Sequence, residues 1–423
     1  MSLKLTKLRE NKTELVDSLY LVALQGMNQL LPLLVMPYLM VVLGAGRYGY
    51  IGFSLSVVQY FTLVVDFGFN LSATKHIALV KGKPDLLRKV FWAVFWAKVG
   101  LMAGTFLVML LLVTTIPTFR TYGEAIFYTY PMVIGSAFTF MWMFQGIGKV
   151  RVIAVINTVS KLVLLPAIFF LVKSADDYLM AALLQALVFV LTAVISCAVL
   201  YRMHVVGKVC FIKKDIVREL KESFPLFLSS ASTSVYTQLF VVILGFVCVS
   251  EVVGCYSSAE RIMRALCFLF YLPISQSFYP KISALSATDR QKGVACFSQV
   301  KVLMLICMLV VSVTLFVLAP LVSTWLGEGY ERLSFLLRIM ACAPVFIGLG
   351  GVYGQMGLVA LGNRISRNHF RDVYFIVALA SLTLVAVLAP WGKDAGAALA
   401  LLVSEILVFI LMFYHSRKDL RAC

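Results

Sequence analysis

The chain has 423 residues, of which 61% are hydrophobic and only 13% are charged. A soluble domain averages about 25% charged residues, so this composition leaves too few polar side chains to cover a soluble surface. The formal net charge of +17 would by itself suit a nucleic-acid partner, but the distribution of the charges argues against one.

Apolar stretches of about 20 residues, the length that crosses a bilayer as a helix, recur along the whole chain. A β-barrel would instead show alternating strands, and the runs 101–113 and 302–318 are apolar at almost every position. The sequence therefore predicts an all-α polytopic membrane protein with about 12 transmembrane helices. The expected spans are, in chain order, roughly residues 15–43, 48–72, 89–113, 122–147, 151–172, 178–201, 223–249, 253–280, 297–319, 333–361, 370–390 and 394–415.

The first span is too long for the apolar region of a signal peptide and no small-residue cleavage site follows it, so we expect it to be retained. With this set of spans, the loops and tails on one side hold 27 lysines and arginines, and those on the other side hold 5. The positive-inside rule then places both termini in the cytoplasm. The basic net charge is thus explained by topology and by contact with anionic headgroups, and no nucleic-acid partner is expected.

The longest polar break separates spans six and seven and divides the chain into two lobes of six spans each. The predicted organisation is a basic N-terminal segment at 1–14, an N-lobe at 15–201, a basic cytoplasmic inter-lobe loop at 202–222, a C-lobe at 223–415 and a cytoplasmic tail at 416–423. Because six is even, the lobes share one orientation, which permits a parallel internal repeat. Gly49 and Lys75 delimit span two much as Gly254 and Lys281 delimit span eight.

Five cations lie outside the predicted loops and tails, and three acids are the clearest intramembrane ones; an unpaired charge in the membrane is unfavourable by about 2.5–3.5 kcal/mol. They are the cations Lys98, Lys161, Arg261, Arg264 and Arg338 and the acids Asp66, Glu260 and Glu405. The cations outnumber the acids, so an interior lined by these residues would suit an anionic substrate.

Span eight carries three of these charges on one helix face. Glu260 and Arg264 have the i,i+4 spacing and order of a favourable ion pair, which leaves Arg261 without a partner in its own helix. Because a guanidinium fits phosphate oxygens two at a time, Arg261 and Arg264 are candidate contacts for a diphosphate. A structural ion-pair cluster between helices is the alternative.

The other intramembrane charges each have two interpretations. Asp66 could carry a proton or bind sodium, or it could pair with Lys98 or Lys161. Lys98 and Lys161 could contact the substrate, or their long side chains could snorkel to the interface. Glu405 could be a coupling carboxylate or a helix-packing partner.

The sequence gives no support for catalysis or a metal. The nine cysteines have no ligand spacing, the four histidines occur singly, and no phosphate-binding loop is present. We therefore expect no enzymatic activity, no metal and no cofactor, and a driving force from a proton or sodium gradient or from removal of the product on the far side.

Three segments resemble signatures of one family. They are Asp66–Lys75 (DFGFNLSATK) at the end of span two, Trp142–Gly146 (WMFQG) at the end of span four, and the stretch from Tyr256 (YSSAER) to Pro280 (PISQSFYP) along span eight. Together with the number of spans, they make the chain similar to the Wzx-type polysaccharide and O-antigen repeat-unit flippases of the multidrug/oligosaccharidyl-lipid/polysaccharide exporter superfamily. One difference is Gly148, because the family often has an acid shortly after this Gln-Gly pair.

The resemblance implies an alternating-access transporter in the bacterial inner membrane, with its two six-helix lobes around a cavity. The implied cargo is an undecaprenyl-pyrophosphate-linked oligosaccharide moved from the cytoplasmic to the periplasmic leaflet, with membrane lipids and polysaccharide polymerase machinery as partners. Arg261 and Arg264 match positions of cavity cations.

The leading alternative is an ion-coupled multidrug efflux antiporter of the same superfamily, although a cavity for cationic drugs should be lined by acids. A flippase for peptidoglycan precursor would usually have two more spans. A sugar polymerase would need a large periplasmic loop, and a scaffold would not need unpaired arginines in the membrane.

Overall fold

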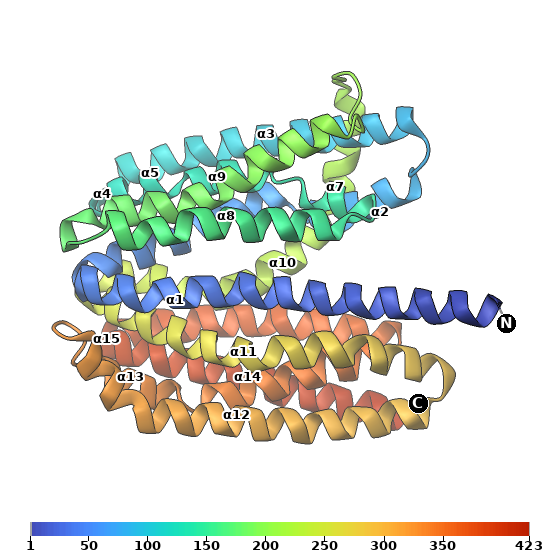
Figure 1. Cartoon of the computed structure of the whole chain (residues 1–423). Helices are drawn as coiled ribbons and strands as arrows, with labels where there is room; N and C mark the ends of the chain where they lie inside the picture. Colours follow the sequence, from blue (N-terminus) through green and yellow to red (C-terminus); the bar gives the residue numbers. More distant parts are fainter. Residues whose placement is uncertain (1, 423) are drawn as a thin grey trace. The chain divides into compact units, whose positions relative to one another are not determined.

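The computed structural model describes the backbone of residues 2–422 and the side chains of residues 31–419, except those at positions 229, 232, 233, 235–237, 287 and 364. Within this part of the chain every regular element is a helix, which confirms the predicted all-α class (Figure 1). Residues 2–14 of the predicted basic segment 1–14 form the beginning of the first helix, and the side chains of the segment lie outside the described residues.

The first part of the chain alternates long helices with a group of short ones. The elements are α1 (Ser2–Asp66), α2 (Phe69–Leu79), α3 (Pro84–Thr115), α4 (Pro117–Thr121), α5 (Gly123–Thr129), α6 (Pro131–Phe138), α7 (Met141–Gly146), α8 (Val150–Leu171), a 3-10 turn (Ala175–Asp177) and α9 (Tyr178–Arg202). Proline is the first residue of α3, α4 and α6, the position at which its missing N–H removes no helical hydrogen bond. The prolines therefore explain why the region around predicted span four is divided into short helices.

The second part of the chain is built from longer helices. The elements are α10 (Lys213–Val247), α11 (Ser250–Thr288), α12 (Arg290–Leu326), α13 (Leu333–Met340), α14 (Ala343–Gly351), a π-helical segment (Val352–Ala360) and α15 (Arg364–Ala422).

Seven helical stretches of the described residues are long and apolar enough to cross a membrane, judged by length and composition. They are Leu31–Leu79, Pro84–Thr115, Val150–Leu171, Ala175–Arg202, Arg290–Leu326, Leu333–Ala360 and Ile365–Asp419. The first and last of these stretches each reach across two predicted spans. The three predicted spans outside the seven, 122–147, 223–249 and 253–280, fall on α5–α7, α10 and α11.

The two longest helices are interrupted where the sequence predicted a connection between spans. Gly44 has φ 66° within α1, between predicted spans one and two. Lys393 has φ 49° within α15, between the last two predicted spans. A left-handed residue breaks the helical hydrogen-bond pattern, so each helix consists of two segments.

The chain forms two compact units. The first comprises Met1–Leu39, Val58–Lys173 and Leu179–Phe227, and the second comprises Met40–Val57, Ser174–Tyr178 and Leu228–Cys423. The predicted lobes supply most of each unit. Residues 40–57 and 174–178 of the predicted N-lobe belong to the second unit. The predicted inter-lobe loop and the beginning of α10, up to Phe227, belong to the first unit.

The first unit has an aromatic core at the ends of its helices. Trp142 and Phe144 of α7 are fully buried with Phe69 of α2. The ring of Phe91 on α3 lies 5.5 Å from the ring of Trp142 and 5.3 Å from that of Phe140. This core fixes α2 and α7 against α3.

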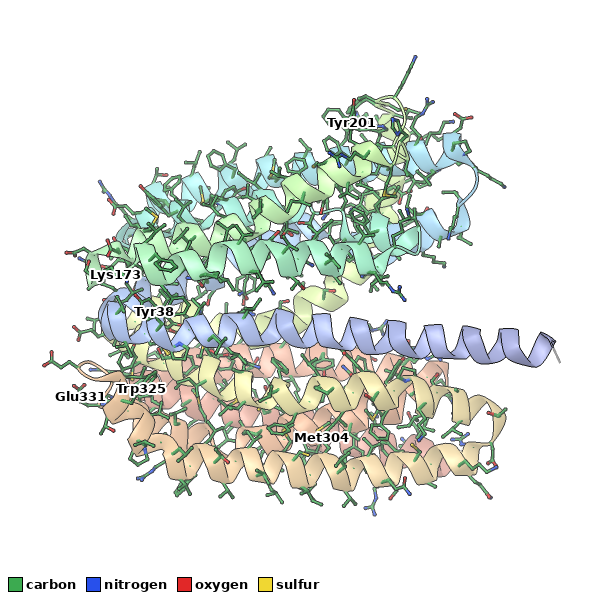
Figure 2. The ribbon with its side chains drawn as sticks, in the orientation of Figure 1. Tyr38, Lys173, Tyr201, Met304, Trp325 and Glu331 are labelled. Atoms are coloured by element: carbon green, nitrogen blue, oxygen red, sulfur yellow. The ribbon has the colours of Figure 1, made fainter. Side chains whose placement is uncertain are left out.

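The second unit is packed around methionines and small residues. Met304 of α12 points into a cluster with Met308, Tyr271 and Met356 (Figure 2). Such flexible thioether side chains fill the irregular space beside a π-helical segment.

Gly49 and Gly254, the residues that open predicted spans two and eight, lie against one another in the second unit. A Cβ on Gly49 would overlap the carbonyl oxygen of Ser250 and lie 3.0 Å from the backbone nitrogen of Gly254. A Cβ on Gly254 would overlap the carbonyl oxygen of Ala45 and lie 2.9 Å from the backbone nitrogen of Gly49. The contact is reciprocal: each glycine lies against the other glycine and against the residue four positions before that other glycine. This is the geometry expected of two helices related by a local two-fold axis.

Candidate functional site

The junction between α1 and α2 places Asp66 at the end of a helix. Phe67 and Gly68 follow with φ values of 42° and 78°, and α2 begins at Phe69. Two successive left-handed residues turn the chain sharply, which explains the Phe-Gly pair of the Asp66–Lys75 motif.

Asp66 and Lys98 form an ion pair within the first unit. Lys98 Nζ lies 2.9 Å from Asp66 Oδ1, and the Lys98 side chain is 3% exposed while that of Asp66 is 29% exposed. Ser136 Oγ lies 3.5 Å from the same carboxylate oxygen. This ion pair is one of the two interpretations that the sequence left open for Asp66. The positive charge of Lys98 is balanced by the Asp66 carboxylate. Substrate binding by Lys98 and ion coupling by Asp66 stay predictions.

Two of the three family-like motifs pack on each other. Thr74 Oγ1 lies 3.2 Å from the carbonyl oxygen of Trp142 and 3.3 Å from Gln145 Oε1. A Cβ on Gly146 would lie 2.6 Å from Ile77 Cβ, so glycine permits the close approach of α7 to α2. Gly148 adopts φ 79°, a conformation that glycine adopts readily and in which most side chains are strained.

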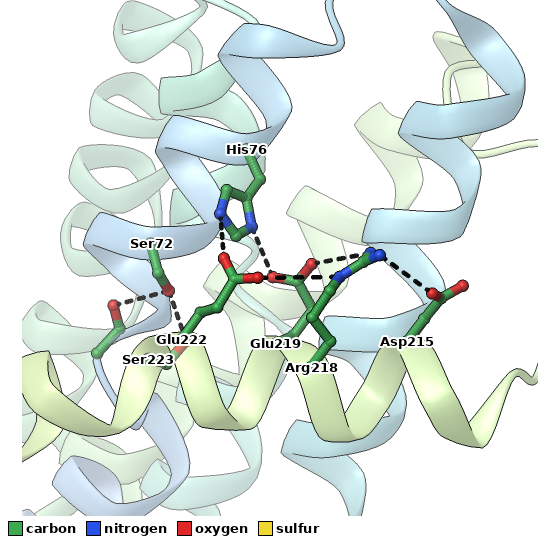
Figure 3. Close-up of polar contacts among 8 residues, drawn as sticks. Ser72, His76, Asp215, Arg218, Glu219, Glu222 and Ser223 are labelled. Carbon is green, nitrogen blue, oxygen red and sulfur yellow. Dashed lines mark hydrogen bonds and ion pairs between the residues drawn. The ribbon is translucent and has the colours of Figure 1, made fainter.

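A polar cluster joins α2 to the beginning of α10, as Figure 3 shows. His76 Nδ1 lies 2.8 Å from Glu219 Oε2, and His76 Nε2 lies 2.9 Å from Glu222 Oε2. One turn earlier on α2, the hydroxyls of Ser72 and Ser223 are 2.6 Å apart. The aromatic rings of Phe67 and Phe227 stack at 4.7 Å beside them. These contacts attach residues 219–227 to the first unit, and sequence reasoning missed them.

Glu219 is the most buried acid of this cluster, with a side chain that is 1% exposed. Its Oε1 atom has no hydrogen-bond partner among the described residues, and the nearest guanidinium nitrogen, Arg218 Nη2, is 3.6 Å away. Burial raises the pKa of Glu219 above its ordinary value, and the hydrogen bond and charge of His76 and the charge of Arg218 only partly oppose this.

A second charged cluster lies in the second unit on α11 and α15. Arg264 Nε lies 2.8 Å from Glu260 Oε1, which confirms the predicted i,i+4 pair. Arg264 Nη1 lies 3.9 Å from Glu405 Oε1, and both carboxylates are buried. Two buried acids therefore lie within 4 Å of one guanidinium.

Arg261 lies beside this cluster but has a different kind of partner. Its Nη1 atom donates to the hydroxyl oxygen of Tyr48 at 3.2 Å, and its guanidinium carbon lies 5.6 Å from the centre of the Tyr48 ring. In the described part of the chain no carboxylate forms an ion pair with Arg261. The Tyr48 contact could not be predicted, because 213 residues separate the two positions.

The two remaining intramembrane cations are Lys161 and Arg338. Lys161 is half-buried on α8, and its predicted contact with substrate stays a prediction. Arg338 is exposed on α13, with its guanidinium carbon 5.4 Å from the ring centre of Phe316. Among the described side chains, no group of three or more histidines, cysteines, aspartates or glutamates is arranged to hold a metal ion.

Solved structures of other proteins show the class of fold to which this chain belongs. The chain aligns with a multidrug resistance MATE family transporter of the MOP superfamily in its inward-facing conformation, with a TM-score of 0.75 and 15% identity over 93% of this chain and 95% of that one. It also aligns with the lipid II flippase MurJ in an inward closed conformation, with a TM-score of 0.73 and 15% identity over 94% and 88% of the two chains. The fold is therefore that of the alternating-access membrane transporters, as predicted.

Sequence comparison assigns the chain within that class. The model of the family described as "Polysaccharide biosynthesis protein" matches residues 15–286. The chain is 31% identical over 406 residues to the "Putative O-antigen transporter" of Escherichia coli (strain K12), which covers 95% of this chain and 96% of that protein. A protein of the same name from Shigella dysenteriae is 27% identical over 407 residues, covering 93% and 98%. The chain belongs to the polysaccharide biosynthesis protein family.

Proposed function

We propose that this protein is a flippase that moves an undecaprenyl-pyrophosphate-linked oligosaccharide repeat unit from the cytoplasmic to the periplasmic leaflet of the bacterial inner membrane. The family, the names of the relatives and the fold that the chain has in common with a lipid flippase support this proposal. The product would serve surface polysaccharide synthesis, with membrane lipids and the polysaccharide polymerase machinery as partners. The charge distribution of the loops supports cytoplasmic termini.

The state of Arg261 is the observation that carries the proposal. Arg264 is held by Glu260 and Glu405, whereas the described contacts of Arg261 are with a neutral tyrosine. An arginine within the membrane that pairs with no described carboxylate retains its positive charge for a ligand, and four of its five N–H donors remain beside the one that binds Tyr48. A pyrophosphate offers the oxygen pairs that a guanidinium binds in bidentate fashion.

Coupling to an ion gradient is a further part of the proposal. Glu260 and Glu405 are two buried carboxylates near one guanidinium, so a bound proton or sodium ion would remove the excess negative charge. We assign this role to Glu405, because its distance to Arg264 is the longer of the two. Glu260 then holds Arg264 in place.

Multidrug efflux is the alternative function, since a MATE family transporter has the same fold. An arginine without an acidic partner would repel the cationic drugs that such a transporter prefers. The two functions therefore make opposite predictions for Arg261, which is required by a flippase and dispensable for efflux.

The test is complementation of a strain that lacks the gene. Deletion should cause one polyprenyl-pyrophosphate oligosaccharide to accumulate on the cytoplasmic side and should remove the surface polysaccharide. The native gene and Arg338→Ala, a control for the loss of an exposed arginine in the same unit, should restore export. Arg261→Ala should be inserted at normal levels and should fail to restore it.

Each result discriminates between the candidates. Increased drug sensitivity without accumulation of a lipid-linked sugar would support efflux. If the deletion strain accumulates the lipid-linked sugar and Arg261→Ala relieves this as fully as the native protein does, the protein is a flippase but Arg261 is not its contact with the anion. Arg264 is less suitable for this test, because its removal would leave two buried acids without their counter-ion.

A further inference from the structure

The segment between α9 and α10 presents both apolar and basic side chains on its surface. Tyr201, at the end of α9 in Figure 2, Val209 and Phe211 are 83%, 65% and 67% exposed. The exposed cations of the same segment are Arg202, Lys208, Lys213 and Lys214. Among the described residues, no carboxylate pairs with any of these four cations. We call residues 201–214 the basic loop.

The basic loop is attached to α3 and has a defined conformation. Trp96 Nε1 donates to the carbonyl oxygen of Cys210 at 3.2 Å, and the Trp96 ring meets the Phe211 ring edge to face at 5.7 Å. Val205 and Val206 turn inward and pack on the aromatic core of the first unit. The outward position of Val209 and Phe211 is therefore imposed by the contacts of the loop.

The contact with Trp96 sets the depth of the loop relative to the membrane. Trp96 lies seven residues inside the predicted span 89–113, which corresponds to about 10 Å along a helix axis. Residues 210 and 211 therefore lie beside the part of α3 near the predicted cytoplasmic end of that span, where a tryptophan is typical of the membrane interface. At this level, exposed apolar side chains meet acyl chains, and the neighbouring lysines meet phosphates.

We propose that the basic loop is a docking surface for anionic phospholipid, with Val209 and Phe211 inserted among acyl chains and Lys208, Lys213 and Lys214 bound to headgroup phosphates. A cluster of four or more cations beside a transmembrane helix is the charge pattern that binds anionic lipid surfaces. Apolar residues next to such a cluster add a second, hydrophobic contribution. The loop thereby holds the end of α9 and the beginning of α10 to the bilayer surface.

The experiment compares the full-length protein in nanodiscs of phosphatidylcholine alone and in nanodiscs that also contain phosphatidylglycerol. Hydrogen exchange of peptides from residues 203–214 is the readout, and no cargo is needed. Protection should be at least about fivefold higher with phosphatidylglycerol, because a single lysine near an anionic surface already strengthens binding by about that factor.

Two variants and one control complete the test. Lys208→Gln with Lys213→Gln and Lys214→Gln should abolish the difference between the lipids, and these exposed side chains are not needed for folding. Val209→Ser with Phe211→Ser should lower protection in both lipids. The control makes the same charge change at the exposed Lys81, Lys83 and Lys149 and should keep the difference.

Equal protection of the native loop in both lipids would overturn the proposal, as would a lysine variant that keeps the difference. Protection that appears only when cytoplasmic proteins are added would also overturn it and would indicate a protein partner.

Discussion

His76 Nδ1 lies 2.8 Å from Glu219 Oε2, and this contact joins α2 to a helix whose residues follow 143 positions later. It belongs to a set that ends at Phe227, the last residue of the first unit. Pro225 lies within the same stretch of α10 and interrupts its hydrogen bonds. The beginning of α10 is therefore fixed to the first unit, and the rest of the helix continues into the second.

This attachment should depend on pH through Glu219. Burial raises the pKa of Glu219 in the folded protein, so the folded state takes up a proton more readily than the unfolded chain. Stability should therefore fall as the pH rises: the contribution of Glu219 is fully present below its ordinary pKa and is lost as the pH rises through the raised pKa. Hydrogen exchange of residues 69–79 and 213–227 should therefore become slower as the pH falls from neutral towards about 5, after correction for the intrinsic rate.

Glu219→Gln is the variant that tests the cause. The amide cannot ionise, so protection should be high at neutral pH and should lose most of its pH dependence. Glu222→Gln is the control, because that side chain contacts the same histidine but is 45% exposed. A pH dependence unchanged by Glu219→Gln would assign the effect to another group.

Removing Asp66 should destabilise the protein more than removing its partner Lys98. Asp66→Asn removes the counter-ion of a lysine that is 3% exposed, and breaking a buried ion pair destabilises by about 3–5 kcal/mol. Lys98→Met keeps the aliphatic volume and leaves the partly exposed Asp66, so we expect a smaller loss of about 1–2 kcal/mol. The double variant should recover much of the stability of Asp66→Asn, as measured by unfolding in detergent. Equal losses for the two single variants would show that the pair is solvated.

The same double variant addresses the ion-coupling interpretation of Asp66. A stable double variant that no longer complements the gene deletion would support a coupling role. Normal complementation would assign the pair to helix packing alone.

The contact of Gly49 with Gly254 predicts that neither position accepts a side chain. Alanine at either position would push apart the segments of α1 and α11, with a loss of about 1–3 kcal/mol or more. Because the contact is reciprocal, the double variant should lose less than the sum of the single variants. Thermal unfolding in detergent measures all three. Gly100→Ala is the control, since a Cβ there meets nothing within 4 Å, and a normal melting temperature for Gly49→Ala would contradict the packing.

The features that were predictable from sequence depend on composition or on neighbours within a helix. The spans follow from uninterrupted apolar stretches, and the Glu260–Arg264 pair follows from a spacing of four residues. The breaks at Gly44 and Lys393 fall where the sequence predicted connections between spans.

The contacts that sequence reasoning missed join distant parts of the chain. Arg261 meets Tyr48 across 213 residues, and no local pattern specifies which tyrosine approaches it. His76 is one of four histidines that occur singly in the sequence, and its two acidic partners, Glu219 and Glu222, belong to the predicted basic inter-lobe loop 202–222. The acids at 219 and 222 are spaced to lie on one helix face, and this was the available signal.

The last prediction concerns Glu405 and the driving force. If the proposed coupling is correct, Glu405→Gln imitates a permanently protonated carboxyl group, and transport should lose its response to an imposed pH gradient. Stability should be unchanged or raised, because the variant removes one of two buried acids that lie near a single arginine. The measurement is cargo translocation in proteoliposomes with and without a gradient. Glu331→Gln is the matched control, since Glu331 lies on an exposed loop in the same unit (Figure 2). A Glu405→Gln protein that still responds to the gradient as the native protein does would exclude Glu405 as the proton carrier and would direct attention to Asp66.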